Sequence, residues 1–457
     1  MARITRFYLE VQARDLASYV RFSAEFRKAA QRAAQKEGDP ALADTLVSRA
    51  TFDRWMTGQI QRIPYTAAAT VLRYMFEMSV ERLFQTVSQE SSGLPAQGAA
   101  LRTLPGVEFD DPLQVMAQAR ALTSSNTDPA LLTMADTSIR SIIDRYEASG
   151  PQQLAGEARM LRTTLHTLIA GQQPSGVRMR LFLLAAQTSG LLAYMAVNAN
   201  KPFQFADAYC TEAEELAQAA TGPDEPVDPR VLDLKMWVAG TRSLALYYNQ
   251  RYDEAHAAAE AGVELGRENP QAIRLLINGS ARALARVNDR RRAEAAIGRA
   301  IELSDRQPHL PTGITACIDF VPYSPARTLA NAITARLSLT DYDRVHAHAE
   351  EIDELIENSD SDWSRALVRL DVATALLQQD SPELERAMLL GGRALHAGAT
   401  APIRSVWQRA NELYVRAAER WRGEPDVGDY AEKLRTWRAQ PQAAPVAVDA
   451  AAVMAPA

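Results

Sequence analysis

Apolar residues recur at helical spacing through nearly all of this chain. After Pro64 they form one stripe of a helix, and a further short helix follows Ser79, whose hydroxyl can cap it. Asp39 and Pro40 are a helix cap and a first-turn proline, which predict another short helix. The N-terminal segment is therefore expected to form a compact unit of five helices, over residues 16–35, 41–46, 49–56, 64–76 and 79–84.

The segment 48–58 is the most informative part of this unit. Ser48 can accept hydrogen bonds from the free amides of a first helical turn. Gly58 can take the left-handed conformation that commonly ends a helix. The sequence therefore predicts one short, capped helix over 49–56.

The two faces of this predicted helix differ in chemistry. Phe52 and Trp55 are three residues apart and share a face. If this aromatic pair is buried, Arg49, Ala50 and Arg54 point outward. A helix that reads DNA divides its surface in this way, between anchoring side chains and side chains that reach base edges.

The helix order and the phrase Ser-Arg-Ala-Thr-Phe-Asp-Arg-Trp-Met-Thr-Gly resemble the Xre-like helix-turn-helix regulators, over roughly residues 18–86. Carried over position by position, the resemblance implies contacts with double-stranded DNA, the operator of such a regulator. The implied base contacts come from Arg49, Ala50 and Arg54, and the implied phosphate contacts come from Ser48, Gln59 and Arg62. The implied core residues are Phe52, Trp55, Leu72 and Leu83.

Two positions depart from the family's pattern. The usual glycine in the turn between the second and third helices is Leu46 here, and the usual acidic residue after the tryptophan-like position is Met56. A changed turn would tilt the reading helix. The alternative to DNA binding is therefore a head that serves in dimerisation or partner docking, within a protein-interaction scaffold.

Composition supports an all-α protein of more than one unit. The chain has 457 residues, more than a single hydrophobic core usually holds, with only 7% aromatic residues and abundant alanine. Its formal charge is −6, yet residues 1–90 contain 13 basic and 10 acidic residues. The N-terminal end thus has the sign of charge that favours DNA, although the excess is small.

Several other functions find no support in the sequence. Cys210 and Cys317 are far apart, so no disulfide framework or thiol-rich metal site is implied, and a reducing cytoplasm fits. No phosphate-binding glycine loop occurs. Of His346, His348 and Glu350, only the first and last align at helical spacing, which disfavours a metal site. We expect no cofactor, no metal and no enzymatic activity.

Turn residues divide the chain into segments. Residues 87–112 are rich in Gly, Pro, Ser and Asp and predict a linker between residues 1–86 and a second domain over 113–438. Residues 439–457, rich in Ala and Pro, predict a disordered tail. The apolar run 181–197 is interrupted by polar residues, so it predicts a buried helix and no membrane contact. Residues 305–325 predict a long connection, for which a purely structural role is favoured over lining a ligand site.

The second domain contains an internal repeat. Leu246, Ala255, Ala259 and Gly262 recur 38 residues later as Leu284, Ala293, Ile297 and Ala300, which indicates a repeated helix hairpin. Small residues at these positions let helices approach closely. The segment Tyr252-Asp253-Glu254-Ala255, echoed by Tyr342-Asp343-Arg344-Val345, resembles the entrance of a tetratricopeptide repeat. The whole chain is similar to bacterial regulators that join an Xre-like head to such repeats.

This resemblance implies an α-solenoid of about six to eight hairpins whose inner face binds a peptide, small molecule or protein. Such a chain would be a cytoplasmic, homodimeric transcriptional regulator. The candidate ligand-binding residues on the inner face are Tyr247, Tyr248, Asn249, Asn278, Arg282, Tyr323, Asn331 and Arg336.

Overall fold

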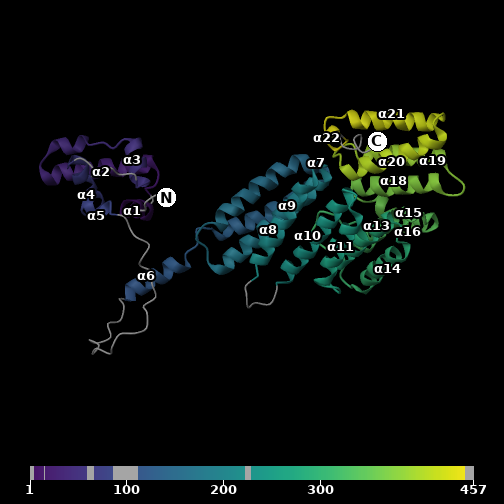
Figure 1. Cartoon of the computed structure of the whole chain (residues 1–457), viewed down its shortest axis with the longest axis horizontal. Helices are drawn as coiled ribbons and strands as arrows, with labels where there is room; N and C mark the ends of the chain where they lie inside the picture. The colour runs from purple at the N-terminus through teal and green to yellow at the C-terminus, as the bar shows by residue number, and fades with distance from the viewer. Residues whose placement is uncertain (1–4, 15, 59–65, 86–111, 222–227, 448–457) are drawn as a thin grey trace, which may run out of the picture. The chain divides into compact units, whose positions relative to one another are not determined.

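The protein is all-α in the residues that its computed structural model describes, which are 5–14, 16–58, 66–85, 112–221 and 228–447. By its internal contacts the chain divides into two compact units, Met1–Glu108 and Phe109–Ala457. The predicted linker 87–112 lies almost entirely outside the described residues. Figure 1 shows the helices of each unit.

The N-terminal unit contains the five predicted helices and one more. Helices α2 (Tyr19–Glu37), α3 (Arg49–Met56), α4 (Thr66–Phe76) and α5 (Val80–Leu83) match the predicted stretches, and the stretch after Pro40 is a 3₁₀ helix, Pro40–Asp44. The additional helix, α1 (Arg6–Ala13), was not predicted.

The unexpected helix α1 supplies the centre of the N-terminal core. Phe7 is fully buried, and its ring lies 5.6 Å from that of Trp55 and 5.8 Å from that of Phe76, measured between ring centroids. The amide of Arg6 also donates to the carbonyl oxygen of Gln85 at 3.0 Å. The first helix therefore closes the unit by packing against its last residues.

The C-terminal unit consists of helices that pair with their neighbours along the chain (Figure 1). It begins with α6 (Pro112–Thr123) and with α7 (Pro129–Ile169), which breaks at Gly150, where φ is 77°. Six helix pairs follow in the described residues. They are α8 (Ser175–Asn198) with α9 (Phe203–Ala219); α10 (Pro229–Tyr248) with α11 (Tyr252–Glu264); the segment α12 (Gln271–Arg274), π-helix Leu275–Ala281 and α13 (Arg282–Arg286) with α14 (Arg290–Arg306); α15 (Pro325–Ser338) with α16 (Tyr342–Glu351) and α17 (Asp353–Glu357); α18 (Asp362–Gln378) with α19 (Leu384–Ala397); and α20 (Arg404–Trp421) with α21 (Pro425–Ala439).

The turn inside four of these pairs has the same backbone geometry. Its central residue is left-handed, with φ of 55° at Asn200, 59° at Gln250, 58° at Asn288 and 58° at Thr340. In each turn the next amide bonds back to a carbonyl five residues earlier, at 2.9–3.0 Å. These bonds satisfy carbonyl groups at the end of the first helix. The turns at Gln250 and Asn288 lie 38 residues apart, which is the spacing of the predicted repeat.

Small side chains bring neighbouring helices close together, both within a pair and between pairs, as predicted from the repeat. Ala255, Ala259 and Ala293 are fully buried. At Gly279, a Cβ atom would lie only 2.6 Å from the Cβ of Ala259, and at Gly262 it would lie 2.8 Å from that of Ala239. No larger side chain fits at either glycine without moving a helix.

The last helices of the unit contact its first pairs. Helix α20 contacts α8, and the Arg404 guanidinium donates to the carbonyl oxygen of Tyr248 at 2.6 Å. Asn200 donates through Nδ2 to the carbonyl oxygen of Val446 at 3.3 Å. The prediction of a disordered tail from residue 439 is wrong up to 447, because Ala444–Ala447 form the short helix α22, with Val446 and Ala447 buried against the core. Residues 448–457 lie outside the described range.

Two further predictions concern the interior. The apolar run 181–197 lies in α8, the one described helix long and apolar enough to cross a membrane, and 89% of its most apolar window is buried inside the unit. The connection between α14 and α15 is packed inward as well. The Trp237 indole donates to the carbonyl oxygen of Asp319 at 2.7 Å, and Ile318 is 1% exposed. This connection therefore packs into the interior of the unit, as a structural role would require.

Candidate functional sites

The first candidate site is the outer face of α3. Ser48 caps the helix by accepting from the Thr51 amide at 3.2 Å, and Gly58 follows its end with a φ of 67°. Phe52 and Trp55 are 2% and 5% exposed in the aromatic core. The predicted limits, cap and buried ridge of this helix are confirmed.

The predicted base-contacting residues share the exposed face of α3. Arg49, Ala50 and Arg54 are all exposed. The Arg54 guanidinium lies along its own helix, where it donates to the Ala50 carbonyl oxygen at 3.1 Å and to the Thr51 hydroxyl at 3.2 Å. These bonds are short-range and exposed, so Arg54 can leave them for a stronger acceptor. The predicted phosphate-contacting residues Gln59 and Arg62 lie outside the described residues, while Ser48 is exposed at the helix start.

The turn before α3 shows the structural effect of having Leu46 where the family usually has glycine. Leu46 is 66% exposed, and its backbone φ is not positive. Glycine is required in a turn mainly where φ is positive. The leucine therefore introduces no backbone strain here, although it leaves an apolar side chain on the surface.

The second candidate site lies on the inner side of the C-terminal unit. A cavity of about 550 Å³, here called the large cavity, is lined by α10, α13, α15, α18 and α20. A small pocket of about 70 Å³ adjoins it and shares part of its lining. The residues that line both are Tyr248, Arg282, Thr334, Ser405 and Arg409.

The structure brings most of the predicted ligand residues to these two spaces. Tyr247, Tyr248, Asn249 and Arg282 line the large cavity, and Tyr248, Asn278, Arg282 and Asn331 line the small pocket. The remaining two predicted residues lie elsewhere. Tyr323 is 1% exposed and its hydroxyl accepts from Asn278 at 3.2 Å, so it supports a lining residue from behind.

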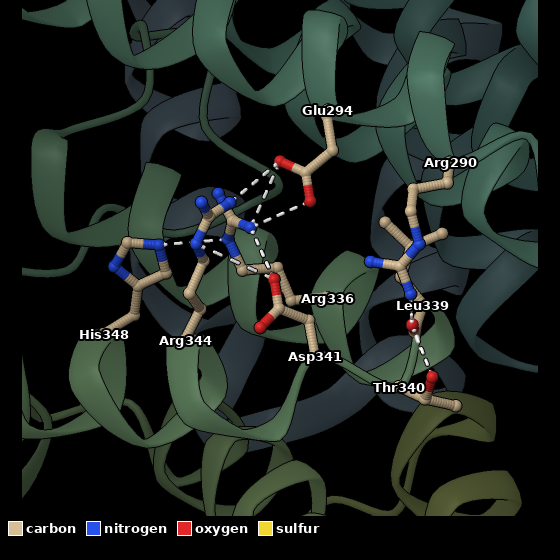
Figure 2. A network of polar contacts seen from close by, with 8 residues as sticks. All are labelled: Arg290, Glu294, Arg336, Leu339, Thr340, Asp341, Arg344 and His348. Atoms are coloured by element: carbon tan, nitrogen blue, oxygen red, sulfur yellow. Dashed lines mark hydrogen bonds and ion pairs between the residues drawn. The ribbon is translucent and has the colours of Figure 1, made fainter.

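Arg336 belongs to a separate polar network that joins three helices (Figure 2). Its guanidinium contacts both oxygens of Glu294 on α14, at 3.0 and 3.1 Å, and Asp341 before α16 at 3.1 Å. It also contacts His348 at 3.2 Å. The Arg336 side chain is only 7% exposed. Since its acceptors are internal, its position indicates a structural role, which corrects its prediction as a ligand contact.

The large cavity is rich in arginine. Its lining includes five arginines and two carboxylates, of which sequence reasoning identified only Arg282. Three of the arginines come from α20, at sequence positions that the predicted repeat did not mark as facing inward. The charged residues are Arg282, Arg286, Arg404, Arg409, Arg416, Asp371 and Glu412.

Arg282 is the most buried of these cations, with 4% of its surface exposed. It donates through Nη1 to the Asn278 side-chain oxygen and lies 4.4 Å from the centre of the Tyr247 ring. Its Nε is buried and makes no hydrogen bond within the described part of the chain. The site thus holds one desolvated guanidinium with an unused donor.

A buried ion pair forms one wall of the cavity. Arg409 contacts the Asp371 carboxylate at 2.9 Å, and the Thr334 hydroxyl donates to the same carboxylate at 2.6 Å. Asp371 is 3% exposed, and this burial raises its pKa, although Arg409 and Thr334 oppose the shift. The pair ties α15, α18 and α20 together around the cavity.

The arginines also act on Tyr248. Burial alone would raise the pKa of its phenol, but the positive charges of Arg282 and Arg409 and hydrogen bonds from Arg282 and Ser405 outweigh burial and lower it. Burial instead raises the pKa of the other core tyrosines Tyr146 and Tyr323. The electrostatic potential around Tyr248 is therefore positive.

His346 and His348, which were considered as metal ligands, contact other polar side chains. His346 contacts the Gln379 side-chain oxygen at 2.9 Å, and His348 lies beside Arg336. Within the described ranges, no group of three or more His, Cys, Asp or Glu side chains could hold a metal ion.

Comparison of the chain with protein-family models finds no match, and comparison with curated proteins finds none either. The geometry of the two candidate sites therefore carries the functional argument.

Proposed function

We propose that this protein is a DNA-binding transcriptional regulator in which α3 is the recognition helix. The observation that carries the proposal is the division of that helix, with Phe52 and Trp55 held in the core and Arg49, Ala50 and Arg54 exposed. A rigidly anchored helix with arginines on its outer face suits insertion into a major groove. This is the arrangement expected of an Xre-like helix-turn-helix head.

The basic residues of α3 would take separate roles. Arginine commonly recognises guanine through two hydrogen bonds, so Arg49 and Arg54 are the proposed base readers. Arg54 would exchange its bonds to its own helix for bonds to a base edge. Ser48, Gln59 and Arg62 would contact phosphates and set the position of the helix on the duplex. The small positive charge of residues 1–90 supports contact of this unit with DNA and predicts modest affinity for a single head.

The C-terminal unit would be a tetratricopeptide-like array that senses a ligand and mediates homodimerisation. The repeated left-handed turn and the paired helices support a repeat array, and the large cavity supports ligand binding. A ligand that prefers one arrangement of the array would change the separation of the two heads. A dimer would read a palindromic site with half-sites ~34 Å apart or a multiple of that distance.

A mobility-shift titration over a range of salt concentrations tests the proposal, with the DNA upstream of the protein's own coding sequence and a random duplex. Arg49→Ala and Arg54→Ala should each weaken specific binding by ~1–3 kcal/mol, whereas Arg62→Ala should weaken both duplexes alike. Arg299→Ala, which removes an exposed charge on α14, is the matched control and should change neither. Equal losses on both duplexes for Arg49→Ala and Arg54→Ala would contradict the base-reading assignment.

The second candidate function is a protein-interaction scaffold whose head does not bind DNA. The exposed apolar side chains of the head favour it, because Val20 is 74% exposed and Leu46 is 66% exposed. Apolar side chains on a small basic head suit dimerisation or docking of a partner. The same titration separates the two functions, since a scaffold gives no specific complex at any salt concentration.

A further inference from the structure

We propose that the large cavity binds a small organic anion through a carboxylate or phosphate group. This inference deepens the sensing half of the proposed function by naming the ligand class. It does not depend on DNA binding by the head.

The lining of the large cavity carries an excess of positive charge. Five arginines and two carboxylates line the cavity. Glu412 lies 2.6 Å from Arg416 and 4.0 Å from Arg286, and Asp371 is occupied by Arg409. Two carboxylates thus serve three of the arginines. Among the described residues, Arg282 has no carboxylate within ion-pair distance, so no ion pair with them neutralises its charge.

Several buried polar atoms of the lining remain without a hydrogen-bond partner among the described residues. Among the described residues lining the cavity, the buried Arg282 Nε, Arg416 Nε and Trp407 Nε1 make no hydrogen bond. All three are donors. No unpartnered buried acceptor occurs among the lining residues that the structure describes. Because a buried, unused donor is costly, the lining is complementary to a molecule rich in acceptors.

Arg282 lies deep in the lining. Arg282 is 4% exposed, so its charge has lost most of its hydration, and the described groups that contact it, such as Asn278 and the tyrosine rings, are neutral. An anion would form charge-assisted hydrogen bonds with the guanidinium, which are about twice as strong as neutral ones. Arginine also presents paired donors that match carboxylate and phosphate oxygens.

The size and aromatic lining define the rest of the ligand. A volume of about 550 Å³ lies within the range of small-molecule sites. Tyr247, Tyr252 and Trp407 line the same space and offer apolar surface to a carbon skeleton. The Arg404 contact with Tyr248 also joins the last helix pair to an early one. Such a bounded space suits a small molecule better than an extended chain.

Calorimetric titration of the full-length protein tests the proposal, in constant 150 mM sodium chloride on the scale of physiological ionic strength, about 0.15 M. The probes are inorganic phosphate and succinate, with succinamide as the uncharged analogue of succinate. We expect saturable binding of at least one anion, with one site per chain, and no binding of succinamide. Preference for phosphate or succinate identifies which anionic group the site takes. If neither anion binds with a Kd below about 10 mM, corresponding to only ~3 kcal/mol of binding free energy, the proposal fails.

Variants locate the binding in the cavity. Arg282→Met should weaken anion binding at least about tenfold, because it removes charge-assisted hydrogen bonds. Arg286→Met keeps the test valid if Arg282→Met does not fold, because the Arg286 side chain is 37% exposed and makes a long ion pair of 4.0 Å with Glu412 and a contact with the Tyr252 ring at 5.7 Å. Arg299→Met, on the exposed face of α14, is the control and should bind like the wild type. Unchanged binding in Arg286→Met and in folded Arg282→Met, or an equal loss in Arg299→Met, would overturn the assignment.

Discussion

Replacing Gly279 by alanine tests whether close helix approach stabilises the C-terminal unit. The added Cβ would lie 2.6 Å from the Cβ of Ala259 and 3.0 Å from the Oγ of Ser243. Carbon atoms ordinarily pack ~3.5–4.0 Å apart, so the helices must separate by roughly 1 Å. Neither alanine can rotate its Cβ away, and Ala259 is fully buried.

The expected effect follows from two opposing contributions. Overpacking typically costs ~1–3 kcal/mol, and replacing a helical glycine by alanine gains ~1 kcal/mol. Because the clash involves atoms fixed to the backbone, we expect Gly279→Ala to lower the free energy of unfolding by ~1–2 kcal/mol. Gly298, on α14, has no atom within 4 Å of the corresponding Cβ, so Gly298→Ala should gain ~0.5–1 kcal/mol.

Urea unfolding followed by tryptophan fluorescence measures both variants. Of the six tryptophans, only Trp55 lies outside the C-terminal unit, so the signal mainly reports that unit. Gly279→Ala should unfold at lower urea than the wild type and Gly298→Ala at higher urea. Equal midpoints for the two variants would refute the packing argument, because both have the same change in helix propensity.

Three further predictions use other features. Thr340→Gly should raise the free energy of unfolding by ~0.5–1 kcal/mol, because a β-branched residue is strained at a φ of 58°. Asn288→Gly, at the same φ, should change the free energy of unfolding less. Urea unfolding measures both variants. In an ultraviolet titration of the folded protein, the Tyr248 phenol should ionise below the ordinary pH range of tyrosine, because the neighbouring positive charges lower its pKa. Tyr248→Phe should remove this phase of the titration, and its persistence in the variant would contradict the assignment. Burial, and to a smaller extent the positive charge of Arg336, lowers the pKa of His348 in the folded state. As the pH falls below ~6.5, the unfolded state therefore binds more protons than the folded state, and the free energy of unfolding decreases. His348→Gln should therefore lose less stability than the wild type between pH 7.5 and pH 5.5 in denaturant unfolding; an equal loss would be evidence against the shift.

Local signals predicted the N-terminal helices well. Ser48 caps α3 and Gly58 follows it in a left-handed conformation, because both properties belong to single residues and their immediate neighbours. Helix α1 lacked such a signal. Its two buried residues, Phe7 and Val11, belong to the core of the unit, where the Phe7 ring contacts α2, α3 and Phe84, the residue after α5. The local pattern does not reveal these contacts.

The repeat in the C-terminal unit was predictable in part for the same reason. Leu246 and Leu284 precede identical turns, so similar local sequence gives similar local structure. The arginines of α20 were missed because their surroundings come from distant segments. Arg404 contacts a residue 156 positions earlier in the chain, and Arg409 contacts one 38 positions earlier. The sequence pattern within one helix does not show which of its charged side chains are enclosed by contacts with distant segments.

The inward course of residues 307–324 has a consequence for how the C-terminal unit resists cleavage and bending. A connection of this length usually offers a cutting site to proteases and a hinge between its neighbours. Here Trp237 holds the Asp319 carbonyl, Gln271 holds that of Phe320, and Ser324 bonds to Gly313. Helices α14 and α15 cannot swing apart without pulling this segment out of the interior. The longest non-helical stretch described in the unit therefore works as an internal brace.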